Sequence, residues 1–293
     1  MRVYKGVEKV TITGADDGVS AADLSRLSRL FPFVEWAILV SSSREGTARY
    51  PNRRWIFEDL AFVAAAHERE LGRPMNLAIH VCGSVSRQVQ SGDMSILLPY
   101  VLMGAQRFQI NGFELKYLDV LERARVESPL MVKGFDRDRD GEPDDVQFIL
   151  QARDALQLDA ARLATEKAPV GSTSILYDAS GGRGISPVLV RVIDRLGVTV
   201  GLAGGINPEN VFDQLQRAED CGYSWIDMES GVRTSDDRFD FAKVLAVLET
   251  SRGFFTRQSA RFAWSGWTEK DFEDFETEIG SCWVTVAGQV RPR

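Results

Sequence analysis

The stretch Gly201-Leu-Ala-Gly-Gly-Ile-Asn-Pro-Glu-Asn210 decides the fold class, because it joins a predicted strand over residues 198–202 to a predicted helix over residues 208–221. Another predicted strand, residues 224–228, follows that helix and ends in a second glycine-containing loop, residues 229–233. Two strands joined through a helix pair in parallel, because the crossover brings the second strand back alongside the first. This region therefore indicates a parallel α/β sheet.

The same alternation runs through the preceding chain. The predicted strands are residues 10–13, 34–40, 77–81, 107–110, 130–132, 174–177, 198–202 and 224–228. The most regular predicted helix is residues 144–166, which carries on one face Ile149, Ala152, Leu156, Ala160 and Leu163. Eight strand–helix units favour a closed (β/α)8 TIM barrel over residues 1–250, because open doubly wound sheets commonly have fewer strands.

An aromatic-rich C-terminal extension, residues 251–293, follows the predicted barrel. Its aromatic side chains are Phe254, Phe255, Phe262, Trp264, Trp267, Phe272, Phe275 and Trp283. This density is too high for a disordered tail, which is poor in aromatic residues. We expect a helix that packs on the barrel; a homodimer contact and an active-site lid are the alternatives.

Composition restricts the function classes. The chain is 44% hydrophobic and 26% charged, which is typical of a globular protein. Its net charge of −7 argues against electrostatic binding to nucleic acid or to an anionic membrane over a broad surface. It does not exclude a local pocket that binds an anion. No apolar run approaches the roughly 20 residues of a membrane span, and the N-terminus has no apolar signal core. Three widely spaced cysteines suggest neither a disulfide framework nor a clustered zinc site, and they favour a reduced, cytoplasmic protein.

The loops after the last two predicted strands favour phosphate binding. They place Gly204 and Gly205 beside Ser230 and Gly231, because neighbouring strands of a barrel end at the same face. Glycine lets backbone N–H groups approach an anion where a Cβ would obstruct it. Tight turns alone would also explain the glycines. The occurrence of both loops on consecutive strands favours a phosphorylated small-molecule ligand.

Asp178 directly follows the sixth predicted strand and precedes a glycine-rich loop over residues 179–184. A carboxyl group at this place projects into the mouth of a barrel, where partial burial raises its pKa towards that of a useful acid. Capping of a turn is the alternative role. The position at the end of a barrel strand favours acid–base chemistry.

Three strand–loop motifs stand in the second half of the chain: Ile175-Leu-Tyr-Asp-Ala-Ser-Gly-Gly-Arg-Gly184, Leu202-Ala-Gly-Gly-Ile-Asn-Pro-Glu-Asn-Val211 and Ile226-Asp-Met-Glu-Ser-Gly-Val232. In order and spacing they resemble the last three strand–loop motifs of the phosphoribosylanthranilate isomerase family of tryptophan biosynthesis. Two upstream segments, Ala48-Arg-Tyr50 and Phe108-Gln-Ile-Asn-Gly112, are similar to further motifs of that family. The resemblance covers about residues 9–249. It implies an Amadori rearrangement, in which a phosphorylated aminoaldose becomes a ketose without a cofactor.

The resemblance also implies roles for single residues. Asp178 matches the family's aspartate acid. Arg49 is expected to contact an aromatic carboxylate, because a guanidinium can hold a carboxylate by two parallel hydrogen bonds; a surface arginine is the alternative. Gln109, Asn111 and Gly182 match substrate-contacting motifs, with Asn111 in place of the family's histidine.

Thr13 stands where the family has its cysteine base. A hydroxyl does not ionise near neutral pH, whereas a thiol with a pKa of about 8.5 does so with modest help. We therefore expect weak or no phosphoribosylanthranilate isomerase activity unless another residue supplies the base, and we expect Thr13→Cys to raise it.

Cys82 is one candidate for that base. Ala78, His80 and Cys82 alternate along the third predicted strand, so they share a face, and Cys82 lies at its C-terminal end. The alternative is a small buried apolar side chain, the usual state of a free cysteine. His80 is expected to be a core residue, and Glu35 or Asp17 could also contribute.

Two other function classes stay open at this stage: a non-catalytic barrel that binds a phosphorylated metabolite, and a different phosphosugar isomerase or lyase on the same scaffold. Residues 136–141 copy the start of a calcium-binding EF-hand loop, but Gln147 stands where that loop requires a glutamate. We interpret this segment as a solvated loop without a metal.

Overall fold

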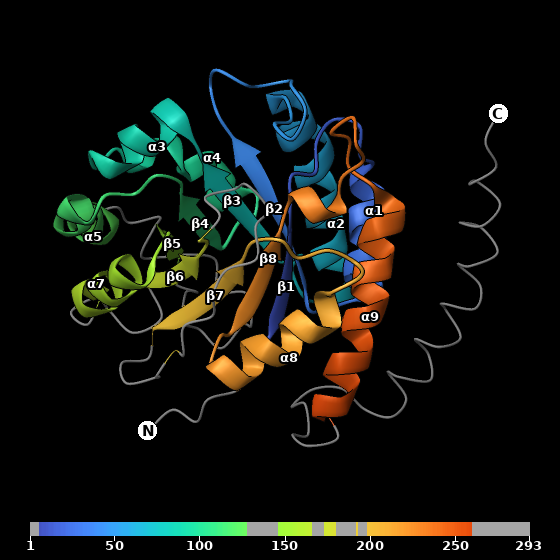
Figure 1. The fold of residues 1–293 in the computed structure, drawn as a ribbon. Helices are drawn as coiled ribbons and strands as arrows, with labels where there is room; N and C mark the ends of the chain where they lie inside the picture. The colour runs from blue at the N-terminus through green and yellow to red at the C-terminus, as the bar shows by residue number, and fades with distance from the viewer. Residues whose placement is uncertain (1–5, 128–145, 166–172, 180–191, 193–197, 260–293) are drawn as a thin grey trace.

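Eight parallel strands close into a barrel in the order of the sequence (Figure 1). The computed structural model describes residues 6–127, 146–165, 173–179, 192 and 198–259. The strands are β1 (Lys9–Thr13), β2 (Val34–Val40), β3 (Leu77–Val81), β4 (Arg107–Ile110), β5 (Gln147–Ala152), β6 (Thr173–Tyr177), β7 (Thr199–Ala203) and β8 (Trp225–Met228). Pairing of Val10 with Ile226 in β8 and with Val34 in β2 closes the ring. The predicted TIM barrel is confirmed.

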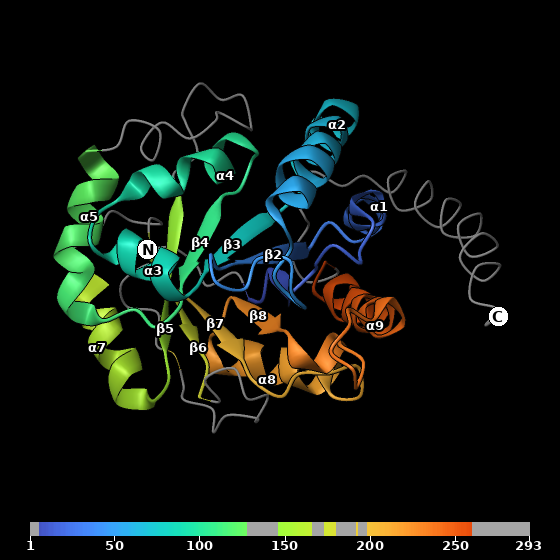
Figure 2. The same cartoon turned by 90° about the horizontal axis from the view of Figure 1, so that it is seen from above.

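Helices surround the strands, as the view from above shows (Figure 2). They are α1 (Ala21–Leu30), α2 (Ala61–Leu71), α3 (Gly83–Gln90), α4 (Leu98–Leu102), α5 (Leu118–Glu127), α7 (Ala155–Thr165), α8 (Val211–Cys221) and α9 (Phe241–Ser259). A π-helical segment, Trp55–Leu60, leads into α2. No helix in the described part of the chain is both long enough and apolar enough to cross a membrane.

The prediction of one helix over residues 144–166 is wrong. Residues Gln147–Ala152 form β5, and α7 begins only at Ala155. Parallel strands are buried on both faces, so their short continuous apolar runs cannot be told from buried helix by periodicity. Leu156 and Leu163, which were expected to be buried, are 83% and 65% exposed. The fifth barrel strand was predicted at residues 130–132, but the strand that pairs with β4 and β6 is β5. Residues 130–132 themselves lie outside the described residues.

The last helix of the barrel continues past residue 250, where the predicted barrel ends. α9 continues to Ser259, so it includes Phe254 and Phe255. The ring of Phe255 stacks on Phe33 with 4.4 Å between centroids, and Phe254 meets Phe212 edge-on. Both phenylalanines therefore belong to the barrel's outer core. Residues 260–293 lie outside the described residues, and the packing of the extension stays a prediction.

Buried polar side chains lie inside the barrel, around the ring of Trp225. The Arg107 guanidinium lies 4.2 Å from the centroid of that ring, and it donates to Glu35 at 2.7 Å. Burial alone would raise the pKa of Glu35, but the positive charges of Arg107 and Lys9 outweigh it and lower the pKa to about 2. Glu35 is therefore ionised in an internal ion pair with Arg107, which does not suit it to proton transfer.

Trp225 can occupy the barrel interior only because β7 carries Gly201 opposite it. A Cβ at Gly201 would lie 2.1 Å from the indole ring, well inside van der Waals contact. Trp225 then packs with Ile149, Leu176 and Ala203 as a small apolar cluster. Leu176 and Ala203 also line the cavity described next, so this cluster supports the cavity from within the barrel.

Candidate functional site

A cavity of about 330 Å³ lies where the loops leave the C-terminal ends of the strands. The described residues that line it are Leu39, Arg44, Arg49, Tyr50, His80, Gln109, Asn111, Gly112, Gln151, Arg153, Leu176, Asp178, Ala203, Gly204, Gly205, Ile206, Asp227, Met228, Glu229, Ser230 and Gly231. Most of the site residues predicted from sequence therefore meet in one cavity. Thr13 and Cys82 are not among these lining residues, and Gly182 lies outside the described part of the chain.

The two glycine loops contact each other on one side of the cavity. Gly204 and Gly205 have φ angles of +109° and +64°, which L-residues rarely adopt. A Cβ on Gly231 would lie 1.9 Å from the carbonyl oxygen of Ile206, so only glycine permits this approach. The Asn210 side chain donates to the Gly205 carbonyl at 2.8 Å and fixes the first loop. Gly204, Gly205, Ser230 and Gly231 all line the cavity.

Asp227, on β8, was not singled out by the sequence. Its carboxylate accepts a 2.7 Å hydrogen bond from the Thr13 hydroxyl, and its side chain is directed into the barrel. Burial raises the pKa of Asp227 to about 8, and the charges of Glu229 and Asp178 add to this rise against the opposing effect of the Thr13 bond. The signal available in the sequence was the alternation of Trp225, Asp227 and Glu229 along a barrel strand.

Asp178 faces the same cavity from the end of β6. It is buried, and its Oδ2 accepts a 3.1 Å hydrogen bond from the Gln151 amide. β7 alone separates β6 from β8, so Asp178 and Asp227 lie on either side of the Ala203–Gly204 segment. Two buried carboxyl groups, Asp178 and Asp227, therefore line one cavity.

Cys82 does not line the cavity, and its sulfur accepts hydrogen bonds from residues that do. The Asn111 amide donates to its sulfur at 3.0 Å, and the Gln109 amide donates to Asn111 at 2.6 Å. Burial raises the pKa of the Cys82 thiol, which favours the neutral form over the thiolate that a base requires. His80 lines the cavity, and burial lowers its pKa to about 3, so its ring is neutral.

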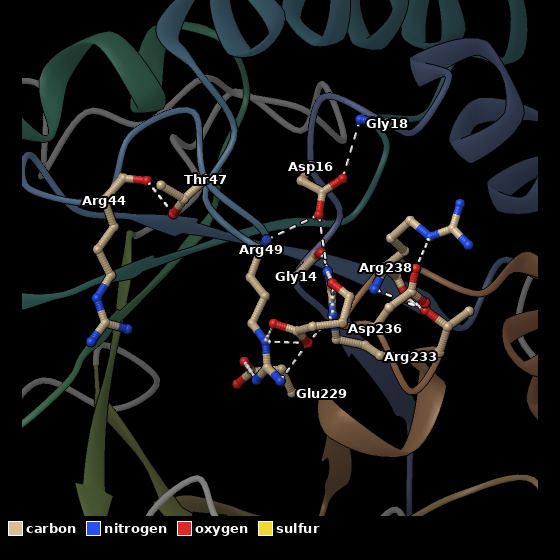
Figure 3. Close-up of polar contacts among 12 residues, drawn as sticks. Gly14, Asp16, Gly18, Arg44, Thr47, Arg49, Glu229, Arg233, Asp236 and Arg238 are labelled. Carbon is tan, nitrogen blue, oxygen red and sulfur yellow. Dashed lines mark hydrogen bonds and ion pairs between the residues drawn. The ribbon is translucent and has the colours of Figure 1, made fainter.

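Arg49 reaches the cavity from the loop after β2, within a network of ion pairs (Figure 3). Its guanidinium donates to Glu229 and, at 2.6 to 2.9 Å, to Asp237. Arg233, buried beneath, donates to Asp237 at 2.8 Å and to Asp16 at 3.0 Å. These ion pairs, which we call the arginine network, tie together the loops after β1, β2 and β8.

The described residues contain no group of three or more His, Cys, Asp or Glu side chains placed to hold a metal ion. The cavity offers instead carboxyl groups, amides and arginines around the two glycine loops. This arrangement suits proton transfer on a polar, anionic molecule.

No protein-family model matches the chain, and no curated protein matches it in sequence. Solved structures are similar to it. TrpF from Jonesia denitrificans is 14% identical, with a TM-score of 0.49 over 84% of this chain and 98% of that one. Phosphoribosyl anthranilate isomerase from Thermus thermophilus is 16% identical, with a TM-score of 0.49 over 84% and 99%. A chain of the tryptophan synthase complex from Pyrococcus furiosus is 12% identical, with a TM-score of 0.50 over 78% and 89%. At such identity this last similarity concerns the barrel fold alone.

Proposed function

We propose that this protein is an aldose–ketose isomerase of the Amadori type, acting on a phosphorylated aminosugar. The observation that carries the proposal is the pair Asp178 and Asp227 in a cavity bounded by two glycine loops. The reaction needs one group that gives a proton to the ring oxygen, which opens the ring, and another that removes a proton from the second carbon of the sugar. Two carboxyl groups in different environments meet that need.

Asp227 is the base in this proposal. Its carboxyl group lies within a hydrogen bond of Thr13, the position where the resembled family has its cysteine. A carboxylate with a pKa of about 8 is nearly as basic as a thiolate with a pKa of about 8.5. Asp227 can therefore replace the thiol, because its basicity is similar and it lies beside the position of the thiol. Asp178 keeps the role of the acid.

The glycine loops are proposed to hold the phosphate. Gly205→Ala is expected to weaken binding of inorganic phosphate by at least about tenfold, because the added methyl disfavours the left-handed backbone that shapes the loop. Gly72→Ala is the matched control, since Gly72 has a φ of +67° against +64° for Gly205 but caps α2, away from the cavity. Both variants should lose similar stability in denaturant. Equal phosphate affinities by titration calorimetry would refute this site.

The activity is tested by isotope exchange. The proton leaves the second carbon, which becomes the ketone, and the first carbon takes up a proton. In D2O the protein is therefore expected to form, from a phosphorylated N-aryl aminoribose, a ketose that carries deuterium on its first carbon, and NMR follows this product. The dephosphorylated compound should react far more slowly, because the phosphate supplies the binding energy that positions the sugar. Binding without exchange or product would instead favour the non-catalytic barrel. The cytoplasmic location and the homodimer stay predictions of the sequence.

A further inference from the structure

The two histidines of the chain are equally buried, but their rings are bonded differently. His67, on α2, and His80, on β3, are each 2% exposed. Nδ1 of His67 forms a hydrogen bond with the Ser25 hydroxyl at 2.9 Å. No residue that the structure describes forms a hydrogen bond with the ring of His80. Buried polar groups nearly always have a partner, so the ring of His80 is an exception that needs a physical reason.

The ring nitrogens of His80 are open to the cavity. His80 lines the cavity, and among the described residues the only enclosed side-chain nitrogen or oxygen without a partner is Oε2 of Glu35. The nitrogens of His80 are therefore not enclosed by protein atoms. The charges of Glu35 and Arg107 act on the His80 ring, but these two side chains are bonded to each other at 2.7 Å. A molecule in the cavity can therefore bond to the ring of His80.

His80 lies across the cavity from the two carboxyl groups. Its neighbours in register, Leu39 on β2 and Gln109 on β4, line the same cavity. In a ring of eight strands β3 lies opposite β7, and Asp178 and Asp227 lie on the two sides of β7 (Figure 2). A sugar bound between them would have the carboxyl groups on one side and the imidazole on the other.

The proposed reaction contains a third proton transfer. Asp178 gives a proton to the ring oxygen, Asp227 takes one from the second carbon, and the first carbon gains one. The hydroxyl on the second carbon must also lose its proton, because its O–H bond breaks as the C=O bond of the ketone forms. This proton leaves for the solvent, from which Asp178 regains the one that it gave, so the protons balance. The hydroxyl needs a neighbouring acceptor.

We propose that His80 is this acceptor: its ring accepts a hydrogen bond from the hydroxyl on the second carbon of the sugar and takes that proton as the ketone forms. This inference rests on the proposed function. The ring is neutral, because burial lowers its pKa to about 3, and a neutral ring has one nitrogen that accepts. A protonated carbonyl is far more acidic than an imidazolium, so even this weak base takes the proton.

NMR of the ring nitrogens tests the contact without turnover. The chain has two histidines, so protein labelled with 15N in histidine gives two sets of ring signals, which His67→Gln assigns. The probe is a linear phosphorylated N-phenyl aminoribitol, which has no carbonyl and does not react. It is expected to shift the ring signals of His80 and leave those of His67 unchanged. The same probe without the hydroxyl on its second carbon should shift them much less.

Titration calorimetry with the same two probes measures the strength of the contact. The unmodified protein is expected to prefer the hydroxylated probe by about fivefold, the usual net contribution of one neutral hydrogen bond. His80→Phe keeps a planar ring without nitrogens, so it should abolish the preference and bind the deoxy probe normally. His80→Gln returns an acceptor and should restore part of the preference. His67→Gln, the matched control, should keep all of it.

His80→Phe should also lower kcat of the isomerisation by about 10² with little change in KM, because the lost group acts on a proton that moves only in the reaction. Equal affinity of the unmodified protein for the two probes, or a preference that survives in His80→Phe, would overturn the inference and leave the proposed function intact. If His80→Phe does not fold, unchanged His80 signals in the unmodified protein with the hydroxylated probe would overturn it. Failure of the unmodified protein to bind either probe would refute the proposed function, and this inference with it.

Discussion

Asp227→Asn is expected to lower kcat/KM of the proposed isomerisation by about 10² to 10⁴, the usual contribution of a positioned proton-transfer group. The amide keeps an oxygen for the Thr13 hydroxyl, so the geometry is preserved while the basicity is lost. Asp119→Asn, an exposed aspartate in the first turn of α5, is the control and should retain full activity. Initial rates at saturating and limiting substrate separate kcat from KM.

The same substitution is expected to raise stability in alkaline solution. The folded-state pKa of Asp227 is about 8, whereas the ordinary value is 3.8. Between these values the unfolded chain loses its proton while the folded protein keeps it, so the free energy of unfolding falls as pH rises and the loss is complete above about pH 8. An amide does not ionise, so Asp227→Asn should be more stable than the unmodified protein at pH 9 and differ less at pH 4. Denaturant titrations at the two pH values measure this. A variant that loses no activity and gains no alkaline stability would contradict the role of Asp227.

Thr13→Val is expected to move the pH dependence of kcat/KM to higher pH. In the unmodified protein kcat/KM should rise up to about pH 8, as Asp227 ionises. The hydrogen bond from Thr13 lowers the pKa of Asp227, and its removal lets that pKa rise further. Each unit of that rise lowers the fraction of the active carboxylate at pH 7 about tenfold, which is 1.36 kcal/mol.

Thr13→Ser separates this effect from packing, because it restores the hydroxyl and should restore the profile. At high pH Thr13→Val should be at least as active as the unmodified protein, since the carboxylate is then fully ionised in both. A pH-independent loss in Thr13→Val would mean that Thr13 acts only through packing. Thr13→Cys remains expected to raise activity, because it places a thiol at the position of the family's base.

Local patterns in the sequence were sufficient for the barrel. The alternation of strand and helix depends on neighbours in the chain, and so does the glycine pattern of the loops around Gly204 and Ser230. Asp178 could be identified because residues at the C-terminal ends of barrel strands face the end of the barrel where active sites lie. The structure brings Asp178 and both loops to one cavity.

The error at β5 has a local cause. Within residues 147–152 the run Phe148-Ile-Leu150 is apolar and buried on both faces, and so short an apolar run has no period that distinguishes a strand from a helix. The following residues of α7 are a good helix, so the periodicity continued backwards across a boundary that only strand pairing with β4 and β6 reveals.

The amino-acid sequence by itself determined the closed (β/α)8 barrel, the glycine loops and the place of Asp178, because each of these depends on residues close together in the chain. The side-chain contacts at the candidate site depend on the tertiary structure. The Thr13–Asp227 bond joins residues 214 positions apart, and the Arg49–Asp237 pair joins residues 188 apart. Burial and neighbouring charges raise the pKa of Asp227, and ion pairs hold Arg49. Both effects arise only when the barrel closes, so no local pattern in the sequence predicts them.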